Sequence, residues 1–244
     1  MEIHGFQTVK NLPCLYHPEL DLLVISDLHL GLEATMTSKG NYVPRHQLDN
    51  LLDDIRSGRK ETEASRVLVN GDLKNEYKTS YSETQEIEKL FKFLKEEFEE
   101  TVIIKGNHDT FIDSTAEKHG LAVKDFHNEA GILFIHGDRA LENFEVGEFK
   151  TLVIGHEHPA LALKDDIGVR EKVDCFLYGK TLEDENFIVL PAFSHISNGT
   201  SINEVPERQL LSPILKNRVS KDTLKAVAVS REAGILEFPE LGKI

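Results

Sequence analysis

The 244-residue chain has no tryptophan, two methionines and two cysteines. Cys14 and Cys175 stand far apart and form no Cys-x-x-Cys pattern, so neither a disulfide framework nor a thiolate zinc site is indicated, although one bridge is left open. No apolar run approaches the roughly 18 residues that a membrane helix needs. The start, MEIHGFQTVK, has no basic segment followed by an apolar one, which a secretory signal would have. We therefore expect a cytoplasmic protein that makes no use of a membrane.

The chain is also short of positive charge. Asp and Glu number 42 against 28 Lys and Arg, giving a net charge of −14. Proteins that hold nucleic acid by neutralising phosphates are usually basic, so this chain alone is not expected to grip long duplex DNA. A pair of divalent cations would bring four positive charges into one cleft, and an acidic protein could then still attract an anionic ester.

Short aliphatic runs that end in polar or glycine-containing turns recur along the chain. They occupy residues 22–25, 67–69, 102–104, 132–135 and 152–154. Continuous apolar runs of this length are typical of strands covered on both faces. No repeat, low-complexity tract or linker divides the chain, and we expect residues 1–244 to form a single domain.

Helical patterns alternate with these runs. Pro44 is expected at a first helical turn, and apolar residues follow it at helical spacing as far as Ile55. Ser82 begins a capping-box pattern ahead of a second helix, and residues 114–120 predict a short third one. This alternation predicts an α/β fold with a partly parallel sheet, followed after residue 158 by a more antiparallel sheet with strands at 160–163, 173–178, 187–190 and 226–229.

Polar groups stand where the predicted strands end, which is where α/β sheets bind ligands. They are Asp27-Leu28-His29, Gly71-Asp72, Gly106-Asn107-His108-Asp109, His136-Gly137 and Gly155-His156-Glu157-His158. A single histidine in such a place is more often structural than a ligand. Five such groups together favour a site for divalent transition metals, which bind oxygen and nitrogen donors. Seven donors exceed the four that one tetrahedral zinc takes, so two ions that share the Asp72 carboxylate fit better.

The order of these motifs from Asp27 to His158 resembles the calcineurin-like metallophosphoesterase superfamily. Residues 191–200, PAFSHISNGT, are similar to the closing segment of one branch, which contains uncharacterised archaeal phosphoesterases and DNA ligase-associated phosphoesterases. The resemblance implies a four-layer α-β-β-α sandwich of two mixed sheets with a dinuclear metal centre at the strand ends.

The resemblance also implies individual roles. One ion would be held by Asp27, His29, Asp72 and His158, and the other by Asp72, Asn107, His136 and His156. His108 would be the catalytic histidine and Asp109 would orient it. The ions would be divalent transition metals, with manganese the first choice and iron, zinc, nickel or cobalt as alternatives.

The implied activity is hydrolysis of phosphodiester bonds in nucleic acid ends, single strands or nucleotides, by attack of a hydroxide that bridges the metals. Two alternatives stay open: a phosphomonoesterase or protein phosphatase using the same site, and a catalytically silent scaffold subunit of a nucleic-acid processing complex. A homo-oligomer or a DNA-processing partner is also left open. The sequence assigns no role to Glu33, Asn75, Asp138, Arg139 or residues 191–203. It offers backbone carbonyls or Glu157 as acceptors for the ring nitrogen that each histidine ligand does not use for the metal.

Overall fold

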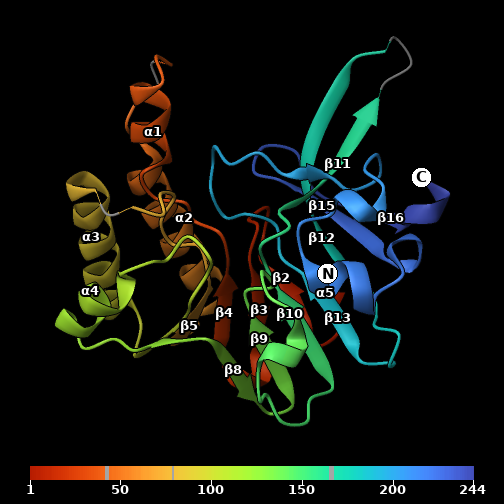
Figure 1. Ribbon diagram of the computed structural model, residues 1–244, viewed down its shortest axis with the longest axis horizontal. Coiled ribbons are helices and arrows are strands. Elements are labelled where there is room, and N and C mark those ends of the chain that lie inside the picture. The colour runs from red at the N-terminus through yellow and green to blue at the C-terminus, as the bar shows by residue number, and fades with distance from the viewer. Residues whose placement is uncertain (42–43, 79, 165–167) are drawn as a thin grey trace.

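The computed structural model describes residues 1–41, 44–78, 80–164 and 168–244 (Figure 1). Its first sheet has the strand order β1-β2-β3-β4-β5-β6-β7. These strands are β1 (Glu2–Ile3), β2 (Phe6–Thr8), β3 (Leu15–His17), β4 (Leu22–Ile25), β5 (Arg66–Asn70), β6 (Glu100–Ile104) and β7 (Val123–Lys124). The strands from β1 to β4 pair antiparallel, and those from β4 to β7 pair parallel. The sheet is therefore mixed.

The second sheet has the order β14-β11-β12-β13-β10-β9-β8, and β15 pairs with β12 and β16. Its strands are β8 (Phe126–Glu129), β9 (Ile132–Ile135), β10 (Thr151–Ile154), β11 (Pro159–Lys164), β12 (Arg170–Lys180), β13 (Asn186–Val189), β14 (Thr200–Ser201), β15 (Lys225–Ser230) and β16 (Gly234–Glu240). β10 lies parallel to β9 and β13, whereas β12 pairs antiparallel with β11, β13 and β15. The expected antiparallel character after residue 158 is confirmed.

Helices cover the outer faces of the two sheets. They are α1 (Leu32–Ser38), α2 (Gln47–Thr62), α3 (Tyr81–Glu97), α4 (Ile112–Lys118) and α5 (Pro213–Arg218), with short 3₁₀ turns at η1 (Pro18–Leu20), η2 (Leu141–Asn143), η3 (Glu207–Gln209), η4 (Lys221–Thr223) and η5 (Leu241–Lys243). Figure 1 shows α1 to α4 gathered on one side and α5 on the other. In the part of the chain that the structure describes, no helix has the length and apolar character needed to cross a bilayer.

Alternate residues of one strand enter different layers of the core. In β4, Leu22 and Val24 join the apolar layer between the sheets, which also holds Phe134 of β9. Leu23 and Ile25 face the other way and pack with the residues of α2 and α3. Both faces of the strand are thereby buried, which explains its unbroken apolar run. The predicted four-layer sandwich of two mixed sheets is confirmed, and its second helical layer is thin, being formed by α5 and 3₁₀ turns.

Two helix starts differ from the sequence-based expectation. α2 begins at Gln47 and not at Pro44, because the buried carboxylate of Glu33 accepts hydrogen bonds from the backbone N–H groups of His46 and Gln47, both at 2.9 Å. α3 is capped by Ser80 and not by Ser82: the Ser80 hydroxyl accepts from the Glu83 N–H at 3.2 Å. In both cases a side chain that satisfies free N–H groups determines where the helix begins.

Candidate metal centre

The expected site residues lie just after five strands of the two sheets. Asp27 follows β4, Asp72 follows β5, and Asn107 follows β6, all in the parallel part of the first sheet. His136 follows β9 and His156 follows β10, which are parallel neighbours in the second sheet. Because parallel strands end at the same edge of a sheet, each sheet presents its polar groups along one edge, and the packing of the sheets joins the two edges.

One group of ligating atoms comes from Asp27, His29, Asp72 and His158, whose donor atoms all lie within 4.8 Å of one another. His158 Nε2 lies 3.0 Å from Asp27 Oδ1 and 3.1 Å from His29 Nε2. His29 Nε2 lies 3.9 Å from Asp72 Oδ2. These are the residues that the resemblance assigned to the first ion, and the fold brings all of them together.

A second group consists of Asp72, His136 and His156 and meets the same 4.8 Å limit. His136 Nε2 lies 3.3 Å from Asp72 Oδ2, and the His136 and His156 ring centroids are 5.1 Å apart. Asp72 belongs to both groups. It therefore occupies the position that a carboxylate shared by two cations needs.

Asn107, the remaining expected ligand, carries an unpaired oxygen. Its amide Nδ2 donates to the Tyr77 hydroxyl at 2.9 Å. Its Oδ1 is buried and accepts no hydrogen bond from any residue that the structure describes. A buried acceptor without a donor is costly, and a bound cation would satisfy it. Together with the converging carboxylates and imidazoles, this orphan oxygen shows that the residues fit a divalent metal.

The backbone at the ligands is unusual. Left-handed φ angles, which side chains other than glycine rarely adopt, occur at Asp27, His29, Asp72, His156 and His158. Such conformations persist only where the surrounding structure enforces them, and they cluster at functional sites. Here they turn the chain sharply at the strand ends, so that both members of each Asp-x-His or His-x-His pair reach the same centre.

Neighbouring polar groups orient several ligands. Ser26 is fully buried and donates to Asp27 Oδ2 at 2.6 Å. The ring Nδ1 of His136 lies 3.0 Å from the Asn70 carbonyl, and the Nδ1 of His158 lies 3.1 Å from the Ser197 hydroxyl. In each histidine the bonded Nδ1 leaves Nε2 as the ligating atom. Ser26 and Ser197 were not predicted as site residues, because a serine beside a motif is no distinctive signal.

The carboxylates and histidines of the site shift one another's pKa. Burial opposes ionisation of Asp72, yet the facing His136 lowers the pKa of this carboxyl below its ordinary value. Burial would lower the pKa of His136, but the carboxylates of Asp72 and Asp27 raise it to about 10. Burial and the neighbouring His158 lower the pKa of His29 to about 4. At pH 7 the Asp72 carboxylate is thus ionised and His29 is neutral, whereas His136 carries a proton that a bound cation would have to displace.

His108 lies beside the two groups, as expected of a catalytic histidine. Its Nδ1 contacts the backbone carbonyl of Asn75, and its ring stacks on Tyr77 with centroids 4.3 Å apart. A third contact is edge-on with the His29 ring at 5.3 Å. The expectation that Asp109 would orient His108 is wrong, since the Asn75 carbonyl and Tyr77 contact the ring instead.

Asp109 instead organises the backbone around the site. It is fully buried, and its Oδ1 accepts from the N–H groups of Leu73 and Lys74 at 2.9 and 3.2 Å, while its Oδ2 accepts from Gly106 N–H at 2.9 Å. Burial, and next the charge of Asp72, raise the pKa of Asp109 to about 7. Asp109 thereby joins the turns after β5 and β6, which carry Asp72 and Asn107.

Other polar residues near the motifs have structural contacts. Glu33 caps α2 as described above. The Asn75 side chain donates to Thr35 Oγ1 at 3.2 Å, so only its carbonyl touches His108. Arg139 pairs with Asp125 at 2.8 Å and Asp138 at 3.7 Å. These contacts account for the four residues that had no predicted role without using a substrate.

Glu157 stands between two ligands but does not serve them. Its Oε2 accepts from the N–H groups of Leu211 and Ser212 at 2.8 and 2.9 Å, just ahead of α5. The expectation that it would orient the histidine ligands is therefore wrong. Its neighbours His156 and His158 have left-handed φ angles and belong to the two donor groups, while Glu157 binds the backbone ahead of α5.

Residues 191–203 run beside the end of β4. Phe193 N–H donates to the Ser26 carbonyl at 2.8 Å, and Ser194 N–H donates to the Asp27 carbonyl at 3.2 Å. His195 lies 2.8 Å from Asp54 of α2 and so points away from the metal groups. This segment reaches the site through Ser197.

Two mixed sheets with helices outside them, and aspartate and histidine groups at the strand ends, define the class of the metallophosphoesterases. A sequence profile of the calcineurin-like phosphoesterase family matches residues 20–217, and the chain belongs to this family. No curated protein sequence matches the chain significantly.

One solved structure bears out the fold. The nuclease MPE of Pseudomonas putida has a TM-score of 0.67 at 17% identity, over 98% of both chains. Two other structures are less similar. A conserved uncharacterized protein of Streptococcus pneumoniae has a TM-score of 0.35 at 14% identity, over 89% of this chain and 97% of that one. Vacuolar protein sorting 29 of Cryptosporidium parvum has a TM-score of 0.37 at 15% identity, over 90% of this chain and 97% of that one.

Proposed function

We propose that this protein is a dinuclear-metal phosphodiesterase acting on nucleic acid ends, single strands or nucleotides. The observation that carries the proposal is the pair of donor groups that share Asp72. With Asn107 added, these groups would supply the ligands for two cations. The nuclease name of the Pseudomonas putida protein that shares the fold supports a diester of nucleic acid as the substrate class.

The chain's own residues would divide the work. Asp27, His29, Asp72 and His158 would hold one ion, and Asp72, Asn107, His136 and His156 the other. Such ions, manganese first among them, polarise the phosphoryl oxygens and lower the pKa of a bound water.

His108 would serve the leaving group. Its Nδ1 is engaged by the Asn75 carbonyl, so Nε2 is the nitrogen left to give a proton to the departing ester oxygen. Tyr77 and His29 pack on two sides of the ring and hold it in place. Because the net charge is −14, only the metal centre would attract the anionic ester. This favours short or single-stranded substrates over long duplexes.

The test is turnover of a chromogenic phosphodiester and its matched monoester with added Mn²⁺. We expect the diester to be preferred, and His108→Ala to lower kcat by roughly 10²- to 10⁴-fold with bound metal retained. His119→Ala is the control, because this histidine ends α4 and packs on Phe91. Preference for the monoester would instead favour a phosphatase. Absence of turnover with every metal tried would favour a silent scaffold.

A further inference from the structure

Tyr77 touches two residues of the candidate metal centre at once. Its hydroxyl accepts the hydrogen bond from Asn107 Nδ2 at 2.9 Å, and its ring stacks on His108 at 4.3 Å with an interplanar angle of 26°. We propose that Tyr77 is a positioning residue, which aims the Asn107 oxygen at the metal pair and holds the His108 ring. The inference rests on the proposed metal centre but requires no particular substrate.

The hydroxyl binds the nitrogen end of the Asn107 amide. An asparagine side chain carries an acceptor oxygen and a donor NH₂, and only the oxygen can bind a cation. With the NH₂ donating to the Tyr77 hydroxyl, the oxygen is the end of the amide that stays free for a cation. The oxygen is left buried and without a donor among the described residues.

The ring restrains the other residue. The Nδ1 of His108 contacts the Asn75 carbonyl, which fixes one edge of the imidazole. The stacked Tyr77 ring then limits rotation about that edge. The His29 ring packs edge-on against a further side, with ring centroids 5.3 Å apart and an interplanar angle of 89°. A histidine that must deliver a proton to one atom needs this degree of preorganisation.

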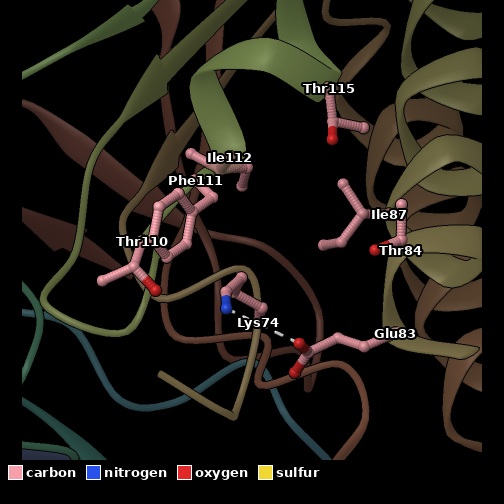
Figure 2. A pocket seen from close by; sticks show the side chains of 8 residues that line it. All are labelled: Lys74, Glu83, Thr84, Ile87, Thr110, Phe111, Ile112 and Thr115. Carbon is pink, nitrogen blue, oxygen red and sulfur yellow. Dashed lines mark ion pairs between the residues drawn. The ribbon is translucent and has the colours of Figure 1, made fainter. Parts of the chain in front are cut away.

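Tyr77 is itself held in place by the loop that carries it. Thr110 Oγ1 contacts the Tyr77 carbonyl. Glu83 Oε1 accepts from the N–H groups of Asn75 and Glu76 at 3.0 and 2.9 Å. Figure 2 shows Glu83 facing the buried Lys74, from which it is separated by 3.6 Å, with Thr110 on the other side of the same small pocket. The loop is therefore anchored at both ends of the stretch that presents Tyr77.

Core packing does not explain Tyr77. Its side chain is 54% exposed, whereas the aromatic residues of the core are buried. Removing it would leave no cavity, so its truncation should change the fold little. Its contacts are with the ligand Asn107 and the catalytic His108, and its effect should show there.

The experiment compares Mn²⁺ binding by calorimetry in the wild type, Tyr77→Phe and Tyr77→Ala. Tyr77→Phe keeps the stacked ring and loses the hydroxyl. We expect its affinity for the more weakly bound of the two Mn²⁺ ions to fall by about tenfold or more. At saturating Mn²⁺ it should regain kcat on the chromogenic diester. Tyr77→Ala should show the same loss of affinity and a lowered kcat that Mn²⁺ does not restore.

Tyr81→Phe is the matched control. Tyr81 is 80% exposed, and its hydroxyl accepts from the Gln85 amide at 2.7 Å, on α3 and away from the metal ligands. We expect this variant to bind Mn²⁺ as the wild type does, and all variants to melt within a few degrees of it.

The inference is overturned if Tyr77→Phe binds both Mn²⁺ ions as tightly as the wild type, or if Tyr81→Phe weakens them equally. A wild type that binds Mn²⁺ but cleaves no phosphoester would refute the proposed activity alone, because the affinities still test Tyr77. A wild type that binds no Mn²⁺ would overturn both.

Discussion

At the scale of single residues, the site depends on buried acceptors that each serve several donors. Asp109 is the clearest case, because one carboxylate receives three backbone N–H groups from two turns. The sequence pointed to Asp109 through its place after His108, and that neighbourhood suggested contact between the two. In space the carboxylate turns the other way, into the backbone.

We expect Asp109→Asn to lower the free energy of unfolding by about 1–3 kcal/mol, because an amide NH₂ would replace an acceptor oxygen opposite backbone N–H donors. The measurement is urea denaturation of the metal-free protein.

Asp113→Asn is the control for this change. Asp113 lies on α4 and makes an exposed ion pair with Lys105, which contributes at most about 1 kcal/mol. Equal losses in the two variants would show that the three backbone hydrogen bonds of Asp109 do not stabilise the protein.

At the scale of elements, the strand ends approach one another too closely for side chains at certain positions. A Cβ on Gly155, just after β10, would collide with Ser26 Oγ and lie 2.6 Å from Asp27 Oδ2. Glycine is therefore required where the turn after β10 passes the turn after β4.

We expect Gly155→Ala to displace Asp27, to destabilise the protein by about 1–3 kcal/mol and to weaken Mn²⁺ binding. Chemical denaturation and calorimetry measure the two effects.

Gly58→Ala is the contrasting change. Gly58 lies within α2, and an added Cβ would meet Leu23 Cδ2 at 3.5 Å, which is an ordinary contact. Alanine is more favourable than glycine in a helix interior. The free energy of unfolding of this variant should therefore rise by about 0.5–1 kcal/mol, and Mn²⁺ binding should be unchanged. A loss of stability in Gly58→Ala comparable to that in Gly155→Ala would contradict the steric argument.

At the scale of the whole molecule, the two sheets share one apolar layer, and we propose that residues 1–244 unfold as a single domain. Phe134 of β9 is fully buried in that layer, next to Phe6 of the first sheet at 6.1 Å between ring centroids.

Phe134→Ala should lower the free energy of unfolding by about 3–5 kcal/mol, because the removed ring leaves a cavity between the sheets. Far-ultraviolet circular dichroism and tyrosine fluorescence should report one coincident transition in the wild type and the variant. Two separated transitions would contradict the single-domain proposal.

A polar contact also ties the layers together. Asp54 of α2 lies 2.8 Å from His195 and accepts from Arg231, which follows β15, at 2.7 Å. Burial opposes ionisation of Asp54, but hydrogen bonds from these two partners outweigh it and lower the pKa of the carboxyl.

A carboxyl with a lowered folded-state pKa stabilises the protein above its unfolded pKa of about 3.9, and this contribution disappears as the pH falls through the folded value. Asp54→Asn should thus be less stable than the wild type at pH 7, and the difference should shrink below about pH 4. Denaturation curves from pH 7 to pH 3 measure it. A difference that is constant over this range would exclude the ionised carboxylate as its source.

The sequence by itself determined the strands that carry the site. A strand buried on both faces must be apolar throughout, and the polar residues that follow it mark its end, so β4, β5, β6, β9 and β10 could be recognised from local pattern alone. The seven candidate ligands followed from the same positions. Short edge strands such as β1, β7 and β14 carry too little pattern to be read in this way.

Only the tertiary structure decided what each side chain touches. Ser197 reaches His158, Tyr77 reaches Asn107, and Asp109 turns from its neighbour His108 toward the backbone. These contacts join segments distant in sequence, and they depend on left-handed turns and on the packing of two sheets. A local pattern is set by neighbours along the chain, whereas a partner across the site is set by where the whole chain has folded.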